Sequence, residues 1–180
     1  MKEFFLEKLF RGITNLKLAY LKMNSFSLRQ AFSKFATGIT VVTTRNSRGA
    51  PYGVTINSFS SLSLDPPLVQ FNIKKESYLR KLIEDFGFFG VNVLNSEQAH
   101  LSDRFSLIKK STEMNDISLR DSPRSLPIFI DVLVAYECRF AQKYEGGDHM
   151  IIIGEVEKLY LGQGAPLLYF GSNYSRLEQI

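Results

Sequence analysis

A run of small polar side chains starts in a predicted strand and ends at a proline pair. Residues 53–67 read GVTINSFSSLSLDPP, with six hydroxyl or amide side chains among nine residues, namely Thr55, Asn57, Ser58, Ser60, Ser61 and Ser63. Because the segment also contains Phe59 and Leu62 and leads into an apolar stretch, we expect several of these groups to be partly buried. Buried hydroxyls need hydrogen-bond partners. A phosphate or polyol chain would supply them, and so would a hydrogen-bonded turn.

A second candidate is the histidine in Glu145-Gly-Gly-Asp-His149, which precedes the apolar run MIIIGEV. A lone histidine beside an aspartate is typical of a structural hydrogen-bonding pair, and we expect Asp148 to cap the turn. His100 is expected at the surface and Cys138 as a small packed side chain. Since neither histidine has ligand spacing with the other or with the cysteine, the sequence does not support a metal site.

Strands must position these groups. β-branched residues at 39–44 and a second strand around 52–56 flank a turn-like segment and predict a hairpin. Further strands are expected over 68–73, 88–94, 132–140 and 149–161.

Three short helices are expected in the same part of the chain. A capping box at Ser27 and Gln30 opens a helix that Gly38 ends. Another covers about 78–85 after Ser77, and the pair Asn95 and Gln98 caps a third that runs through Phe105.

The strands do not alternate with long helices, and no GxGxxG is present. We therefore expect a mostly β fold, an antiparallel barrel of six to seven strands with short peripheral helices. Any bound nucleotide must be held by something other than a Rossmann turn or a P-loop.

The net charge of +4 is concentrated in residues 1–24, which carry five basic and two acidic side chains, or +3. The remaining +1 on 156 residues argues against a nucleic-acid partner. No apolar run is long enough for a transmembrane helix, and a single cysteine favours the cytoplasm.

Apolar residues at helical spacing predict an amphipathic extension over 1–24, ahead of a domain over 25–180. This helix could contact a membrane surface or a partner, or pack on its own domain or a dimer mate. Met23 could also be the true start of the protein.

Six segments, in order, resemble the flavin reductase-like proteins of the FMN-binding split-barrel superfamily. They cover about residues 26–177 and are FATGITVVTT (35–44), NSF (57–59) with LDPP (64–67), FGVNVL (89–94), LSDRF (101–105), EGGDH (145–149) and PLLY (166–169). The resemblance implies a homodimeric split barrel that moves hydride from NADH or NADPH to FMN or FAD. Many members supply reduced flavin to a separate flavin-dependent monooxygenase.

The resemblance also implies roles for individual residues. Thr55, Asn57 and Ser58 would contact the ribityl chain and the isoalloxazine edge, and Ser61 and Ser63 would lie towards the phosphate. Ile56 is a further implied cofactor-binding residue. Ser77 would add a hydroxyl and helix N-terminal amides. His149, beside Asp148, is the candidate catalytic residue that positions NAD(P)H. The remaining implied cofactor-binding residues are Lys75, Arg104, Asp148 and Tyr174, together with His149 itself.

Two departures from the family pattern affect these roles. Phe170-Gly-Ser-Asn173 precedes Tyr174 where many relatives have a basic or histidine-containing run. The strand at residues 68–73 and the following Lys74-Lys75 also differ from the commonest family sequence, and Lys75 either pairs with a flavin phosphate or is solvated. The alternative function is a flavin-binding split-barrel protein without reductase turnover, acting in electron transfer, storage or sensing.

Overall fold

The computed structural model describes residues 23–106, 114, 116–120 and 122–177. The chain divides into two compact units, 1–32 and 33–180. Almost all of the helix predicted over 1–24 lies outside the described residues, and the predicted domain boundary at residue 24 stays a prediction. No helix among the described residues is long and apolar enough to cross a membrane.

The helix α2 (Ser25–Phe32) belongs to the first unit. The side chain of Asn24 accepts hydrogen bonds from the backbone N–H groups of Phe26 and Ser27, each at 2.9 Å, and the Ser27 hydroxyl accepts one from Asn24 N–H at 3.0 Å. Asn24 is therefore the N-cap. The predicted capping box at Ser27 is wrong, because Ser27 lies inside the helix, and the helix ends at Phe32 well before Gly38.

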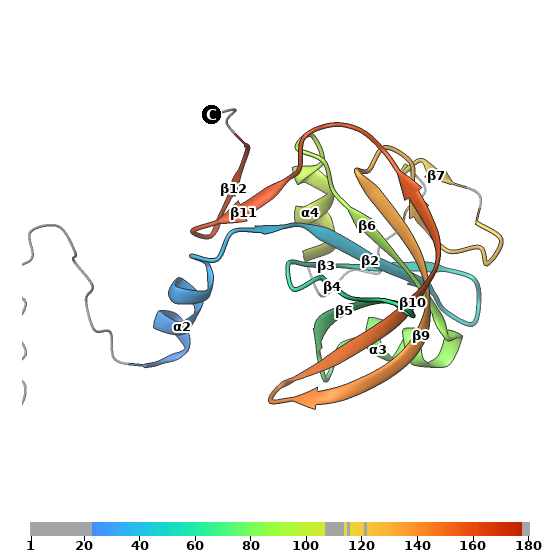
Figure 1. Ribbon diagram of the computed structural model, residues 1–180, viewed down its shortest axis with the longest axis horizontal. Coiled ribbons are helices and arrows are strands. Elements are labelled where there is room, and N and C mark those ends of the chain that lie inside the picture. Colours follow the sequence, from blue (N-terminus) through green and yellow to red (C-terminus); the bar gives the residue numbers. More distant parts are fainter. Residues whose placement is uncertain (1–22, 107–113, 115, 121, 178–180) are drawn as a thin grey trace, which may run out of the picture. The chain divides into compact units, whose positions relative to one another are not determined.

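A seven-stranded antiparallel sheet forms the second unit (Figure 1). Its spatial order is β3-β2-β6-β9-β10-β5-β4. The strands are β2 (Thr40–Arg45), β3 (Pro51–Ile56), β4 (Ser60–Leu64), β5 (Pro67–Lys74), β6 (Phe88–Val93), β9 (Val134–Gly146) and β10 (His149–Leu161). The six predicted strands are confirmed, and β4 is an additional strand within the polar segment.

The sheet curls into a split barrel. Its edge strands, β3 and β4, are consecutive in the chain and are joined only by residues 57–59. Bulges between Ile153 and Gly154 and between Val156 and Lys158 bend the long β9–β10 hairpin, which favours this curling. The link between β3 and β4 thus crosses the opening where the barrel does not close. We call this link, residues 57–59, the seam.

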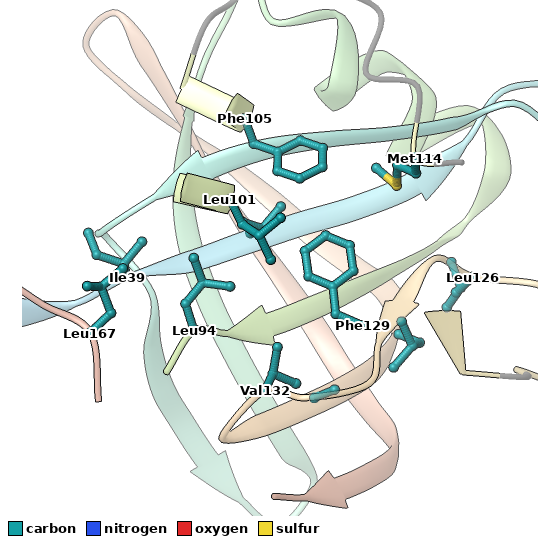
Figure 2. Packing of buried hydrophobic residues seen from close by; sticks show 12 residues of the cluster. Ile39, Leu94, Leu101, Phe105, Met114, Leu126, Phe129, Val132 and Leu167 are labelled. Carbon is teal, nitrogen blue, oxygen red and sulfur yellow. The ribbon is translucent and has the colours of Figure 1, made fainter. Parts of the chain in front are cut away.

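Hydrophobic clusters lie on both faces of the sheet. Val42, Phe71 and Phe89 belong to a cluster on the concave face, since strands far apart in the sheet order meet there. The consecutive residue Val41 belongs to the other cluster, with Phe105 and Phe129 (Figure 2). There, α4 (Ala99–Ser106) and β8 (Ile128–Phe129) cover the outer face.

Short elements complete the unit. The helix α3 (Tyr78–Phe86) contributes Leu79 and Ile83 to the concave cluster and ends at Gly87, whose φ of 77° favours glycine. The strand β8 pairs with β7 (Leu119–Arg120). A three-stranded sheet contains β1 (Thr37–Gly38), β11 (Leu168–Phe170) and β12 (Asn173–Ser175).

The predicted cap of α4 is confirmed in its contacts. The Gln98 side chain accepts the Asn95 N–H at 3.0 Å, and the Asn95 side chain accepts the Glu97 N–H at 2.9 Å. Cys138 is buried in the concave cluster, as expected, and burial raises the pKa of its thiol. His100 is exposed, also as expected.

Candidate flavin site at the barrel seam

Three predicted residues lie at the seam or just before it. The Thr55 hydroxyl donates to the carbonyl of Ser102 at 2.7 Å. The Ser58 hydroxyl accepts the Asn72 N–H at 3.0 Å and donates to the Asn72 carbonyl at 3.1 Å. Backbone groups of the protein therefore already bind these two hydroxyls. Asn57, in contrast, is exposed, and its side chain has no hydrogen bond in the part of the chain described.

The next predicted residues lie on the edge strand β4. Ser61 pairs with Val69 of β5 and Ser63 with Leu68, with a bulge between the two pairs. Their hydroxyls have no hydrogen bond to any described residue. Ile56 packs against the concave cluster and supports the end of β3. The serines are therefore the residues of this segment whose hydroxyls can bind a ligand.

The segment after β5 carries a cation and an uncommitted hydroxyl. Lys75 forms an ion pair with Glu145 at 2.9 Å, and its backbone N–H donates to the Asp148 carbonyl at 3.1 Å. Lys75 is thus neither simply solvated nor free. Ser77 is the N-cap of α3, yet its side chain makes no capping hydrogen bond. Its hydroxyl and the first amides of α3 remain available to an anion.

The β9–β10 turn places the histidine next to this segment. Nδ1 of His149 lies 2.8 Å from Oδ1 of Asp148, and this hydrogen bond lowers the pKa of the Asp148 carboxyl. The hydrogen bond from Lys75 likewise lowers the pKa of Glu145. Both carboxylates are therefore charged at neutral pH, and Nε2 of His149 remains available.

Strand register brings the seam close to the histidine. Ser58 binds Asn72, which pairs with Ile151 of β10, and Lys74, two residues further along β5, pairs with His149. Two residues of a strand span about 7 Å. The structure thus gathers the seam, Lys75 and His149 at one end of β5.

Two further predicted residues lie in a separate group around α4. The Tyr174 hydroxyl lies 2.6 Å from Oδ1 of Asp103 and 2.8 Å from the Ser102 hydroxyl. Burial and the Asp103 hydrogen bond raise the pKa of Tyr174. Arg104 pairs with Asp116 at 2.8 Å. Ser102 connects this group to the seam, because its carbonyl accepts the Thr55 hydroxyl.

Two residues of the site were not among the predicted ones. Asn72 anchors Ser58 through its backbone, which no side-chain pattern reveals. Glu145 holds Lys75, and the only sequence signal for it is an acidic residue beside the predicted glycine turn. The pairing spans 70 residues, so spacing along the chain could not identify it.

The uncommitted groups define what the site can bind. They are one amide, three hydroxyls, a helix N-terminus and an imidazole nitrogen, which suit a phosphorylated polyol attached to a planar polar ring. Among the described residues no group of three or more His, Cys, Asp and Glu side chains could hold a metal ion.

Comparison with known proteins gives a consistent result. The sequence profile of the flavin reductase like domain matches residues 32–178. The FMN reductase (NADH) SmoA of Agrobacterium fabrum is 36% identical over 87% of this chain and 88% of its own length. The flavin-dependent monooxygenase reductase subunit HsaB of Mycobacterium tuberculosis is 37% identical over 84% of this chain and 82% of its own length.

Solved structures resemble this chain over nearly the whole fold. The NADH:FAD oxidoreductase SgcE6 of Streptomyces globisporus, in complex with NAD and FAD fragments, aligns with a TM-score of 0.83 and 30% identity, covering 89% of this chain and 98% of its own. The native flavin reductase PheA2 aligns with a TM-score of 0.79 and 34% identity, covering 87% of this chain and 100% of its own.

Proposed function

Because the chain belongs to the flavin reductase-like domain family, we propose that it is an NAD(P)H-dependent flavin reductase that supplies reduced FMN or FAD to a separate flavin-dependent monooxygenase. Relatives named as reductase components of such monooxygenases support the partner. When bound, the nicotinamide supplies a hydride and the flavin accepts it, so the protein needs no nucleophile of its own.

The proposed site rests on a contrast between two kinds of polar side chain. Some already have hydrogen-bond partners in the protein, and others have none among the described residues. Ser58 and Thr55 are bound to backbone atoms and fix the shape of the seam. Asn57 beside them and Ser77 at the start of α3 have no side-chain partner among the described residues. We assign Asn57 to the flavin ring or ribityl chain and Ser77 to the phosphate. Ser61 and Ser63 pair with β5 on the side of the seam away from Ser77, where their hydroxyls can contact another part of the flavin.

We assign the nicotinamide to His149. Its Nδ1 is fixed by Asp148, so the imidazole is oriented and Nε2 can donate to or accept from a carboxamide. The role of the protein here is orientation and exclusion of water rather than proton transfer. Thr55 and Tyr174 act on the site through their neighbours, since both are already bound to residues of α4. Arg104, itself a residue of α4, is paired with Asp116.

We further propose a homodimer that works in the cytoplasm. Leu62 and Leu64 flank the site serines on β4 and are 45% and 94% exposed. A second copy that covers them would also exclude water from the site. The single, buried Cys138 fits a reducing compartment.

The test follows the absorbance of reduced nicotinamide with purified full-length protein, with NADH or NADPH and with FMN, FAD, riboflavin or no flavin. Oxidation that depends on added flavin supports the proposal, and oxidation without it indicates a tightly bound flavin. Binding of flavin without any nicotinamide oxidation would overturn the reductase function. Ser77→Ala should weaken FMN binding more than riboflavin binding, whereas the matched control Ser118→Ala, at an exposed serine away from the seam, should change neither.

A further inference from the structure

One groove of the molecule has no part in the proposed flavin site. It measures about 480 Å³ and lies between the β2–β3 turn, residues 45–48, and one face of α3. The helix side is lined by Tyr78, Lys81, Leu82, Asp85 and Phe86, which recur at three- and four-residue steps. We call this the α3 groove. Its volume lies within the usual range of about 300 to 1,000 Å³ for ligand pockets.

The α3 groove has an excess of positive charge. Arg48 lines the side of the β2–β3 turn and Lys81 lines the side of α3, and neither has a side-chain hydrogen bond or ion pair to any described residue. The guanidinium of Arg45 is held by the backbone carbonyls of Gly49 and Ser125. Asp85 is the one acidic side chain of the lining. Two uncommitted cations in a concave site favour an anionic ligand.

Aromatic rings flank these cations. Tyr78 is 53% exposed and its ring packs edge-on against Tyr52, with the centroids 5.2 Å apart. Phe86, at the other end of α3, is 38% exposed and packs edge-on against Phe88. Each ring is held by a neighbour and keeps part of its surface exposed. Such rings can stack on a flat heterocycle without losing much side-chain entropy.

The groove starts where the proposed flavin site ends. Tyr78 follows Ser77, which we assign to the flavin phosphate, and the lining then continues along the nine residues of α3. A nine-residue helix is about 13 Å long. A second phosphate and a nucleoside attached at Ser77 would therefore run along the face that carries Lys81 and lies opposite Arg48.

We propose that the α3 groove binds the adenosine phosphate half of a dinucleotide, so that FAD gains contacts there that FMN lacks. This rests on the proposed function for the position of the first phosphate. NADH and NADPH contain the same adenosine phosphate group, and they are the alternative source of this ligand chemistry.

The test uses AMP as the probe, titrated by calorimetry into the full-length protein saturated with FMN. We expect AMP to bind, with an affinity that falls as salt is added. Arg48→Gln and Lys81→Gln should each weaken AMP binding by about threefold to fivefold, the size expected for one exposed ionic contact. Lys158→Gln, which removes an exposed lysine of β10 outside the groove, is the matched control and should change nothing.

Two further readouts identify the source of the group. If it belongs to FAD, both variants weaken FAD binding and leave the KM for NADH unchanged. If it belongs to NAD(P)H, they raise that KM and leave FAD binding unchanged. The proposal is overturned if AMP does not bind at millimolar concentration, or if Lys158→Gln weakens its binding as much as the groove variants do. FMN reduction by the natural protein is measured in parallel at saturating NADH or NADPH, so its absence would overturn the proposed function, whereas AMP binding tests the groove separately.

Discussion

The Ser58 hydroxyl binds both backbone polar groups of Asn72, accepting from the N–H at 3.0 Å and donating to the carbonyl at 3.1 Å. In the β4–β5 register Ser60 pairs with Gln70, so position 58 would lie opposite residue 72 if the ladder continued. The side chain thus takes the place of a backbone pair at the point where the chain crosses from β3 to β4. It stabilises the seam and leaves the side chain of Asn57 free.

Substitution of Ser58 should mainly lower stability, whereas substitution of Asn57 should mainly weaken flavin binding. Ser58→Ala leaves two backbone groups of Asn72 without a protein partner. Because Asn72 is exposed and water can replace the lost hydroxyl, we expect the free energy of unfolding to fall by about 0.5 to 1.5 kcal/mol. Asn57→Ala should leave stability within about 0.5 kcal/mol and weaken flavin binding. Urea unfolding and flavin titration measure the two effects. Unchanged flavin affinity in Asn57→Ala would contradict the proposed site.

Lys75 and Glu145 form an ion pair at 2.9 Å, so we expect Glu145 to compete with the flavin phosphate for Lys75. Glu145→Gln removes the carboxylate charge and keeps the side-chain size. We expect FMN affinity to increase about twofold to fivefold, which is the scale of an exposed ion pair. Riboflavin, which has no phosphate, is the control ligand. An equal gain for riboflavin would show that Lys75 does not contact the phosphate.

Replacing each histidine separately distinguishes a role of His149 in the nicotinamide site from a general effect of losing a histidine. His149→Ala removes the imidazole that Asp148 orients, and we expect the KM for NAD(P)H to rise, or hydride transfer to slow, by about tenfold or more. Flavin affinity should change less. His100→Ala, at an exposed residue of α4, is the control. A variant in which only flavin affinity falls would assign His149 to the flavin instead.

The strands could be predicted because they contain runs of β-branched and apolar residues, whose successive side chains pack on opposite faces of the sheet. Val41 and Val42 are adjacent β-branched residues that enter different clusters, and such runs are recognisable without tertiary information. The edge strand β4 was missed because its serines resemble a loop, and only the pairing with β5 makes them a strand.

The residue types of the site could be predicted from the sequence, but not which of these side chains are free to bind a ligand. Thr55, Asn57 and Ser58 are all small and polar, and the sequence does not show which of them form hydrogen bonds within the folded protein. Ser102 and Asn72, whose backbone groups bind Thr55 and Ser58, are 47 and 14 residues away in the sequence. The ion pair of Lys75 depends in the same way on the β9–β10 turn.

Gly154 should not tolerate a side chain. A Cβ at this position would overlap the ring of Phe89 and approach the Cβ of Cys138 at 3.1 Å, inside the concave cluster. Gly154→Ala should lower the free energy of unfolding by about 1 to 3 kcal/mol, the usual cost of overpacking. At Gly38 nothing lies within 4 Å of the added atom, so Gly38→Ala is the control. Equal stability of the two variants in urea would show that β10 shifts to make room.

The hydrogen bond between Tyr160 and Glu137 on the outer face of the sheet should make the free energy of unfolding depend on pH in the alkaline range. The Tyr160 hydroxyl donates to the Glu137 carboxylate at 2.5 Å, and Glu137 is only 2% exposed. Burial first, and then this hydrogen bond, raise the pKa of Tyr160 from 10.0 to about 12. Because the folded pKa lies above the unfolded one, the stabilisation is fully present below pH 10 and is lost as the pH rises through about 12.

Tyr160→Phe removes the donor and leaves a buried carboxylate without it, so we expect a loss of about 1 to 3 kcal/mol in the free energy of unfolding at pH 7. The difference from the natural protein should shrink above pH 10, where the tyrosine begins to ionise in the unfolded chain. Tyr144→Phe is the matched control, since its hydroxyl donates to Gln142 at 2.7 Å on a side chain that is 52% exposed. Urea unfolding at several pH values measures both variants. If the two lose the same stability at pH 7, or if the loss in Tyr160→Phe does not depend on alkaline pH, the burial of Glu137 is not what makes the Tyr160 hydroxyl important.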